Sequence, residues 1–440
     1  MSAPRDRYPG ERGFMHIGVY GSGYVGTVVS ACLADFGNPV TCYDSDSDRL
    51  TATAQGIVPF YEKNLKDVIR RNVRAGRLIY STDLESFTKK SELLFLAEDD
   101  CASIDDIAVQ VAMNGNNKAV LVLVTPAPVG TARRVEQKLR EAGRKQAVVS
   151  HPVFLTDGCA VEDFNWPDRV VIGTENSDAV MMLKQIYRPL AMRGVPIIVT
   201  NYETAELVRE ASTAFVATKI SFINELSLLC EHVSADAVDL ALALGLDKKI
   251  APRCLQPGAG FGGPFVESEM EALVQLANNS GISLKILAAA REVNTSLSDR
   301  VVDKICHLVH KVEDKEVGLL GLAFKPNTNS VASSSSIVLA KSLTEKGAHV
   351  RAYDPVAIPD AKQELESLPI HYCDSAYHAA EGADALVVST GWPEFRALDF
   401  ERIKRLLRKP IIVDTKNLLD AGRMKSMGFQ YVGMGRARKT

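Results

Sequence analysis

Residues 16–26 read H-I-G-V-Y-G-S-G-Y-V-G, a short apolar run followed at once by a glycine-rich loop. The apolar run is too short for a helix and predicts a buried strand. Glycine at positions 21, 23 and 26, between a strand and a helix, is the spacing of a dinucleotide-binding turn. In such a turn Gly21 permits the tight bend, Gly23 lets a pyrophosphate approach the backbone, and Gly26 lets the helix pack closely on the strand. The N-terminus of that helix offers unpaired N–H groups to the phosphates.

A second apolar run, Val40–Asp44, ends in a carboxylate that lies eighteen residues beyond Gly26. At the end of a strand Asp44 would accept a hydrogen bond from a ribose 2′-hydroxyl and repel a 2′-phosphate, so NAD is favoured over NADP. We expect further cofactor contacts from Tyr24, Val25 and Arg49. The alternative is that the glycines are kept only for packing of the turn.

The alternation of short apolar runs with longer helical patterns continues outward from this turn. The first set of runs is His16–Tyr20, Val40–Asp44, Leu93–Ala97, Ala119–Thr125, Ala147–Ser150, Val170–Gly173 and Ile197–Thr200. A second set follows at Val317–Leu322, Val350–Tyr353, Ala385–Ser389 and Ile411–Asp414. Such alternation is typical of βαβ units around a parallel sheet.

Between the two sets of strands the pattern is helical. Glu203–Val233 contains no Gly or Pro, and Ser283–Val312 is a second long helical stretch. The loop Gln256–Pro264 between them is too rich in glycine for regular structure and suits close approach by a ligand. We therefore predict an α/β fold in which two Rossmann-like parallel-sheet domains are joined by a central helical domain. The predicted divisions are a flexible tail at 1–14 and domains at 15–200, 201–312 and 313–440.

Composition excludes several classes of protein. The 440 residues are 46% hydrophobic and 24% charged, with 51 Lys and Arg against 54 Asp and Glu, so neither disorder nor a nucleic-acid-binding surface is indicated. The eight cysteines show no CxxC spacing, so the sequence signals neither a zinc site nor a disulfide framework. No apolar run of about 18 residues is present. We expect a cytoplasmic protein with no bound metal and no membrane span.

Several ordered segments together resemble the UDP-glucose/GDP-mannose (nucleotide-sugar) 6-dehydrogenase family, from Met15 to about Asp420. These segments are Gly21–Gly26, Gly56–Glu62, Pro128–Thr131, Pro152–Gly158, Pro167–Gly173, Ala217–Glu225, Gly260–Gly263, Gly321–Thr328, Tyr353–Pro355 and Trp392–Phe395. The resemblance implies an N-terminal NAD-binding domain, a central helix that makes a homodimer, and a C-terminal domain that binds the nucleoside diphosphate. It implies a substrate such as UDP-glucose, whose C6 alcohol becomes a carboxylate in two hydride transfers to NAD, and a role in polysaccharide biosynthesis.

The chain departs from the family pattern where the chemistry is done. The family's cysteine, which captures the C6 aldehyde so that a thioester can form, corresponds to Phe265, and a phenyl ring forms no covalent adduct. The glutamate that assists thioester hydrolysis corresponds to Val153. Cys254 lies eleven residues before Phe265, and we expect it to be a small buried apolar residue rather than a substitute nucleophile.

Other family positions are changed more mildly. The lysine and asparagine that stabilise a developing oxyanion correspond to Arg209 and Thr213, and the aspartate after the cysteine corresponds to Glu269. We take these three as the candidate catalytic residues. The family's arginines correspond to Lys249, which would reach across the dimer, to Ala332, and to Lys416. The substrate-binding residues implied by the resemblance are Phe154, Leu155, Lys219, Asn224, Lys249, Gly260, Phe261, Gly262, Gly263, Phe324, Lys325 and Lys416. Many of these could instead persist for packing.

Three acids, Glu98, Asp99 and Asp100, replace an uncharged segment of the family at the carboxyl end of a strand, where such sheets bind ligands. If these carboxylates line the NAD crevice, they repel the cofactor's phosphates and weaken NAD binding. They could instead point into solvent, or do acid–base work or hold a cation.

Three functions follow from the sequence. We predict a catalytically altered homologue, a pseudoenzyme with respect to uronate formation, that binds a nucleotide sugar and NAD. The alternatives are a single two-electron oxidation of a UDP-sugar, and a non-catalytic sensor or scaffold that pairs with an active homologue. An ordinary four-electron dehydrogenase is disfavoured, because the thiol, the glutamate and the lysine are all absent together.

Overall fold

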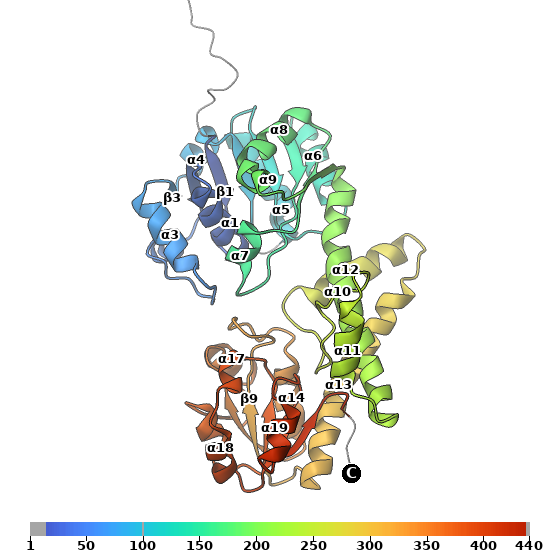
Figure 1. The fold of residues 1–440 in the computed structure, drawn as a ribbon. Helices are drawn as coiled ribbons and strands as arrows, with labels where there is room; N and C mark the ends of the chain where they lie inside the picture. The colour runs from blue at the N-terminus through green and yellow to red at the C-terminus, as the bar shows by residue number, and fades with distance from the viewer. Residues whose placement is uncertain (1–14, 99–100, 437–440) are drawn as a thin grey trace, which may run out of the picture. The chain divides into compact units, whose positions relative to one another are not determined.

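The computed structural model describes residues 15–98 and 101–436 of the chain. The chain divides into two compact units, the first ending at Arg209 and the second beginning at Glu210 (Figure 1). Each unit is built around one sheet. The helix α10 (Tyr202–His232) starts in the first unit and continues into the second.

The first unit holds an eight-stranded sheet. Its strands are β1 (Ile17–Tyr20), β2 (Val40–Tyr43), β3 (Leu78–Ser81), β4 (Leu93–Leu96), β5 (Val120–Leu123), β6 (Ala147–Ser150), β7 (Val170–Gly173) and β8 (Ile197–Thr200). They lie in the order β3-β2-β1-β4-β5-β6-β7-β8. All neighbours are parallel except β6 and β7, which meet antiparallel at the pair Ser150 and Gly173. The expected parallel sheet is therefore confirmed apart from this one pair.

Helices cover both faces of this sheet, because the strands bury side chains on both sides. The helices are α1 (Tyr24–Asp35), α2 (Ser47–Ala54), α3 (Leu65–Arg74), α4 (Leu84–Lys90), the 3-10 turn η1 (Cys101–Ser103), α5 (Ile104–Asn114), α6 (Thr131–Glu141), α7 (Ala160–Asn165), α8 (Ser177–Ile186) and α9 (Arg188–Met192). Alternate residues of β4 serve the two faces: Leu93 and Phe95 pack with α1 and α3, and Leu94 and Leu96 pack with α4, α5 and α6.

The second unit contains a six-stranded sheet and the helical middle of the chain. Its strands are β9 (Glu316–Leu320), β10 (His349–Tyr353), β11 (His371–Tyr372), β12 (Ala385–Val388), β13 (Ile411–Asp414) and β14 (Gln430–Gly433), all parallel, in the order β11-β10-β9-β12-β13-β14. Its helices beyond α10 are α11 (Ala237–Leu246), α12 (Val266–Asn279), α13 (Lys285–Val309), α14 (Ser335–Glu345), α15 (Ile358–Glu364), α16 (Ala376–Ala380), α17 (Pro393–Arg396), α18 (Phe400–Leu406) and α19 (Ala421–Ser426). The two Rossmann-like sheets and the helical middle confirm the predicted fold class.

The helix α13 joins the helical middle to the second sheet, because it contributes to the apolar cores of both. Ala214 and Ala217 of α10 pack with Met270 of α12 and Ala290 of α13, so small side chains bring the three helices together. Further along α13, residues such as Ile305 enter the core of the six-stranded sheet. The first half of α13 thus packs against other helices, and its second half packs against the strands of the sheet.

One helix of the part that the structure describes, α10, is long and apolar enough by length and composition to cross a membrane. Only 39% of its most apolar window is buried inside the protein. Core helices of soluble proteins pass the same test, and α10 also buries the polar side chains of Glu206 and Asn224 within the fold. We therefore treat α10 as part of the helical middle.

Candidate functional site

The glycine-rich turn of the first unit has the geometry of a phosphate-binding loop. Gly21 has φ +98°, and α1 starts at Tyr24 after Gly23, with no side chain capping its first N–H groups. A Cβ on Gly26 would lie 2.0 Å from the carbonyl oxygen of Gly21, so any larger residue would push the helix off the loop. The uncapped amides and the tight backbone fit a pyrophosphate group, as the sequence predicts.

Asp44 follows β2, and its side chain is hydrogen-bonded to Ser22 of this turn. Its Oδ2 accepts hydrogen bonds from the Ser22 N–H (2.9 Å) and the Ser22 hydroxyl (2.6 Å), and its Oδ1 accepts from Asp46 N (3.0 Å) and Arg49 Nη2 (2.9 Å). Burial acts to raise the pKa of Asp44, but hydrogen bonds from Ser22 and Asp46 and the charge of Arg49 hold it below its usual value. The carboxylate is therefore ionised and can accept a hydrogen bond from a ribose hydroxyl.

Glu98 lies against the glycine turn. A methyl group built on Gly21 would be 3.1 Å from Glu98 Oε1, which places this carboxylate beside the backbone that would face a pyrophosphate. Its charge also adds to burial in raising the pKa of Tyr20 to about 12. Asp99 and Asp100, the other two acids of the segment, lie outside the described residues.

Replacing Glu98 with glutamine is expected to tighten NAD binding about three- to tenfold. At about 5 Å and an effective dielectric near 20, one carboxylate–phosphate repulsion is about 3 kcal/mol at most, and water screening reduces it to about 1 kcal/mol. Calorimetric titration of NAD into the wild type and Glu98→Gln measures the change. The exposed carboxylate variant Glu85→Gln on α4 is the matched control and should bind as the wild type does. Equal affinity of all three proteins would show that the Glu98 charge does not reach the cofactor.

The structure brings together Arg209, a predicted catalytic residue, and Val153, which stands at the position of the family's glutamate. Val153 is buried, and the Arg209 guanidinium donates from Nη1 to its backbone carbonyl. Thr213 follows one turn later on the same face of α10. The backbone of Val153 therefore holds the Arg209 cation, and the residue at this position is a valine where the resemblance implies a glutamate.

Phe265 and Glu269 belong to the start of α12. Phe265 is the residue before the helix, and its carbonyl oxygen accepts from the Glu269 N–H at 2.9 Å. The Glu269 side chain is buried. At the position that the resemblance assigns to a nucleophile, the chain thus has an aromatic residue, which immediately precedes a regular helix.

The second unit holds a pocket of about 730 Å³. The loops that follow β9, β12 and β13 form one part of its wall, and α10, the segment 252–262 and Val266 of α12 form the rest. Because β9 and β12 are neighbours from opposite halves of the strand order, the pocket lies where the order reverses, the usual ligand site of such sheets. Seven predicted substrate residues line it: Asn224, Gly260, Phe261, Gly262, Phe324, Lys325 and Lys416.

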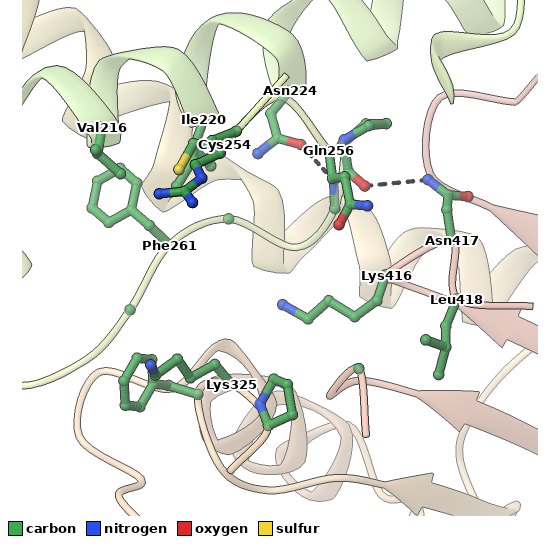
Figure 2. A pocket seen from close by; sticks show the side chains of 18 of the residues that line it. Val216, Ile220, Asn224, Cys254, Gln256, Phe261, Lys325, Lys416, Asn417 and Leu418 are labelled. Carbon is green, nitrogen blue, oxygen red and sulfur yellow. Dashed lines mark hydrogen bonds between the residues drawn. The ribbon is translucent and has the colours of Figure 1, made fainter. Parts of the chain in front are cut away.

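The lining of this pocket is cationic. Figure 2 shows Lys325 and Lys416 across the pocket from Asn224 and Phe261. Arg253 and Arg396 add two more cations, and no Asp or Glu lines the pocket within the described residues. Burial lowers the pKa of Lys416 to about 8, while the charge of Asp414 acts to raise it. Size and charge together suit a nucleoside diphosphate.

The glycine-rich loop is held in place by two asparagines. Asn294 accepts from Phe261 N at 2.8 Å and donates to Phe261 O at 3.2 Å, and Asn224 Oδ1 accepts from Gly258 N at 2.7 Å. Gly260 has φ +94°, and a Cβ there would lie 2.3 Å from Asn294 Oδ1, so the loop requires glycine. The buried Nδ2 of Asn224 has no partner among the described residues, which leaves a hydrogen-bond donor for a ligand in the pocket.

Other predicted substrate residues lie elsewhere. Lys219 donates to the carbonyl oxygens of Ile250 (3.0 Å) and Ala251 (3.3 Å), and Lys249 is exposed. Gly263 packs on the ring of Phe324. Phe154 and Leu155 line a cavity of about 30 Å³ in the first unit. None of these residues lines the 730 Å³ pocket, and their contact with substrate stays a prediction.

The expectation for Cys254 is wrong. The residue is exposed rather than buried, and it lines the 730 Å³ pocket. Its backbone has a φ of +64°, in the left-handed region that non-glycine residues adopt mainly in turns, which fits a loop position rather than a core position. Arg253 and Arg396 were also missed by sequence reasoning. Arg396 directly follows the Trp392–Phe395 segment, which was the only signal for it.

Three domain models of one family match the chain. They are the NAD binding domain (residues 15–191), the central domain (203–296) and the UDP binding domain (318–421) of the UDP-glucose/GDP-mannose dehydrogenase family.

Individual relatives agree with these matches. The UDP-glucose 6-dehydrogenase TuaD of Bacillus subtilis is 36% identical over 432 residues, which cover 96% of this chain and 93% of that protein. A UDP-glucose 6-dehydrogenase of Pseudomonas aeruginosa is 36% identical over 447 residues, with 96% and 98% covered. A solved UDP-glucose dehydrogenase from Pyrobaculum islandicum superposes with a TM-score of 0.88 at 29% identity, covering 98% of this chain and 100% of that one. With its two sheets, its glycine turn and its cationic pocket, the chain belongs to the UDP-glucose/GDP-mannose dehydrogenase family.

Proposed function

We propose that this protein binds a UDP-sugar in the 730 Å³ pocket and NAD at the glycine turn, and does not complete the four-electron oxidation to a uronate. The proposal rests on a contrast between the 730 Å³ pocket, which keeps groups that bind a nucleotide, and the positions of the family's nucleophile and glutamate, which have lost theirs. The pocket keeps four cations and the donor of Asn224, whereas Phe265 and Val153 offer no thiol and no carboxylate.

The pocket supports a diphosphate ligand on chemical grounds. Lys325 and Lys416 supply ammonium groups, and Arg253 and Arg396 supply guanidinium groups that can pair with two phosphate oxygens at once. The aromatic ring of Phe261 also lines the pocket and offers a face on which a base can stack. Two of the relatives named above are UDP-glucose 6-dehydrogenases, which makes UDP-glucose the first ligand to test.

The second oxidation requires groups that the chain does not supply at the expected positions. NAD, when bound, supplies a hydride acceptor. Oxidation of an aldehyde further requires a nucleophile on C6, and neither the ring of Phe265 nor the isopropyl group of Val153 can attack carbon or activate water. The exposed thiol of Cys254 lines the 730 Å³ pocket and does not occupy the position that the resemblance assigns to the nucleophile.

A single two-electron oxidation is the second candidate, and the position of Arg209 favours it. This cation is held by the Val153 carbonyl, with the Thr213 hydroxyl one turn away on α10. A guanidinium and a hydroxyl can stabilise the alkoxide of an alcohol that is losing hydride, a step that needs no thiol. Glu269, the third predicted catalytic residue, lies on α12 of the second unit.

We also propose that the protein forms a homodimer through the helical middle and works in the cytoplasm. Large apolar side chains are exposed on α10 and α11, among them Phe215 (67% exposed), Leu242 (64%) and Leu246 (77%). Exposed apolar residues on neighbouring helices favour burial by a second copy. Seven cysteines with described side chains are free, as in a reducing compartment.

The proposal is tested with purified protein, NAD and UDP-glucose. We expect UDP-glucose to bind in a calorimetric titration, while mass spectrometry detects no UDP-glucuronate after prolonged incubation with NAD. One NADH per sugar oxidised, with the C6 aldehyde as the product, would select the two-electron candidate, and no NADH would select a sensor or scaffold. Steady formation of two NADH per sugar would refute the loss of the second oxidation.

The double variant Phe265→Cys/Val153→Glu extends the test. It returns a thiol and a carboxylate to the positions that the resemblance assigns to them, so slow uronate formation would show that only these groups were missing. Single variants are the matched controls, because neither group alone supports both thioester formation and its hydrolysis. The same product from both single variants would show that another residue does the chemistry.

A further inference from the structure

Two histidines and a cysteine gather at the edge of the six-stranded sheet. His371 starts β11, Cys373 follows that strand, and His378 lies on α16. One ligand atom from each of these three side chains lies within 4.8 Å of the other two. The two imidazole rings meet edge to face, with centroids 5.4 Å apart. Within residues 15–98 and 101–436 this is the one group of three His, Cys, Asp or Glu side chains close enough to share a metal ion.

The backbone that carries these side chains is firmly held. His371 and Cys373 are two residues apart on an extended segment, so their side chains point to the same face. The segment pairs with β10, and Cys373 N donates to Ala352 O at 2.8 Å. On α16, His378 N donates to the Ser375 hydroxyl at 3.2 Å. The cluster therefore rests on a paired edge strand and a capped helix turn.

Two charged residues, Arg351 and Asp374, lie next to the cluster. Arg351 of β10 donates to the His378 carbonyl at 2.7 Å, and the side chain of Asp374 is exposed next to Cys373. Burial raises the pKa of the Cys373 thiol, with Arg351 acting to lower it and Asp374 to raise it. The thiol is therefore protonated in the metal-free protein, and a bound metal would displace that proton to the buffer.

The three side chains of the cluster differ in their exposure to solvent. His371 is exposed, His378 is half-buried, and Cys373 is 1% exposed within the apolar core. A cation entering from solvent would meet the imidazoles first and the sulfur last. In a tetrahedral zinc site the ligand atoms lie about 3.5 Å apart, as follows from Zn–N near 2.0 Å and Zn–S near 2.3 Å. Rotation of the two histidine side chains can supply a contraction of about 1 Å.

We propose that His371, Cys373 and His378 form a binding site for a thiophilic divalent cation of the Zn²⁺ class, which ties β11 to α16. Two imidazole nitrogens and one thiolate fill three tetrahedral positions, and water fills the fourth. On binding, the Cys373 S–H bond breaks, the sulfur bonds to the metal, and the proton leaves to the buffer. None of the three residues lines the 730 Å³ pocket, so the site is separate from the proposed nucleotide site.

The test uses the full-length protein, stripped with a chelator and kept reduced. Titration with Co²⁺ should produce one sulfur-to-cobalt charge-transfer band per chain, and Zn²⁺ should abolish it by displacement. Zinc in about hundredfold excess over its Kd should raise the melting temperature by about 5 °C. We expect Cys373→Ser to remove the band, and His371→Gln to weaken zinc binding at least tenfold.

Matched controls separate this site from adventitious binding. His349→Gln and Cys306→Ser change a histidine and a cysteine of the same unit outside the cluster, and both should bind zinc as the wild type does. His371 is exposed, so His371→Gln tests the site even where Cys373→Ser lowers stability. The proposal is overturned by a cobalt band that survives Cys373→Ser, or by equal zinc affinity of His371→Gln and His349→Gln.

Discussion

Replacing Asp354 with alanine is expected to lower the free energy of unfolding of the second unit by about 3–5 kcal/mol. The side chain is 2% exposed and follows β10. Its Oδ2 accepts from Leu322 N (2.8 Å), Ala323 N (3.1 Å) and Trp392 Nε1 (3.1 Å). Alanine would leave these donors buried without an acceptor, which costs more than the hydrogen bonds themselves contribute.

The same carboxylate also organises its own loop. Oδ1 accepts from Val356 N (3.0 Å) and Ala357 N (2.8 Å), so Asp354 joins the loops that follow β9, β10 and β12. Two of these three loops, those after β9 and β12, contribute to the wall of the 730 Å³ pocket. We therefore expect the alanine variant to lose UDP-glucose affinity together with stability.

Urea denaturation followed by tryptophan fluorescence measures this effect. The chain has two tryptophans, of which Trp166 is 65% exposed in the first unit and Trp392 is 6% exposed in the second, so Trp392 reports local unfolding. Asp303→Ala removes an exposed carboxylate of α13 and is the control, with an expected change below about 0.5 kcal/mol. A loss below about 1 kcal/mol for Asp354→Ala would contradict a central role for this side chain.

The affinity for UDP-glucose is expected to fall about tenfold between pH 7 and pH 9. Burial lowers the pKa of Lys416 to about 8 in the unliganded protein. At pH 7 most of the protein therefore carries the ammonium, and at pH 9 only about a tenth does, since each pH unit above the pKa reduces the protonated fraction about tenfold. The diphosphate diester of UDP-glucose keeps its charge over this range, and the arginine variant described next corrects for the uracil N3–H, which begins to ionise near pH 9.

Two variants of Lys416 isolate this titration. Lys416→Arg keeps its charge at pH 9 and should bind almost independently of pH. Lys416→Met removes the charge and should bind about 30-fold more weakly at pH 7, or about 2 kcal/mol, again with little pH dependence. The exposed Lys409→Met is the control and should follow the wild-type profile. A tenfold fall that persists in Lys416→Arg would assign the titration to another group.

The strands that the sequence predicts are those with continuous apolar runs. β1, β4, β5, β12 and β13 are buried on both faces, so their residues are almost all apolar and their positions are clear from the sequence. The three strands that sequence reasoning missed are β3, β11 and β14. Each lies at an edge of its sheet, and in each the apolar run is short or interrupted by polar residues.

The antiparallel pair β6 and β7 shows a different limit. Both segments have the composition of buried strands, and both were expected in a parallel sheet. Their direction depends on the path of the chain from Ser150 to Val170, which contains only the short helix α7 between them. Strand direction is set by such connections rather than by side chains, and the residues of the strands do not record it.

The sequence by itself was enough to recognise the glycine turn, the acid after β2, and the residues at positions 153 and 265. Each of these belongs to a short local motif, so it can be identified without knowing which distant segments pack against it. The tertiary structure alone decided which retained residues share a pocket, that Cys254 is exposed, and that Cys373 meets two histidines. These facts depend on strand register, loop conformation and the direction of each side chain. Which side chains come close to one another is decided only when segments far apart in the sequence pack together.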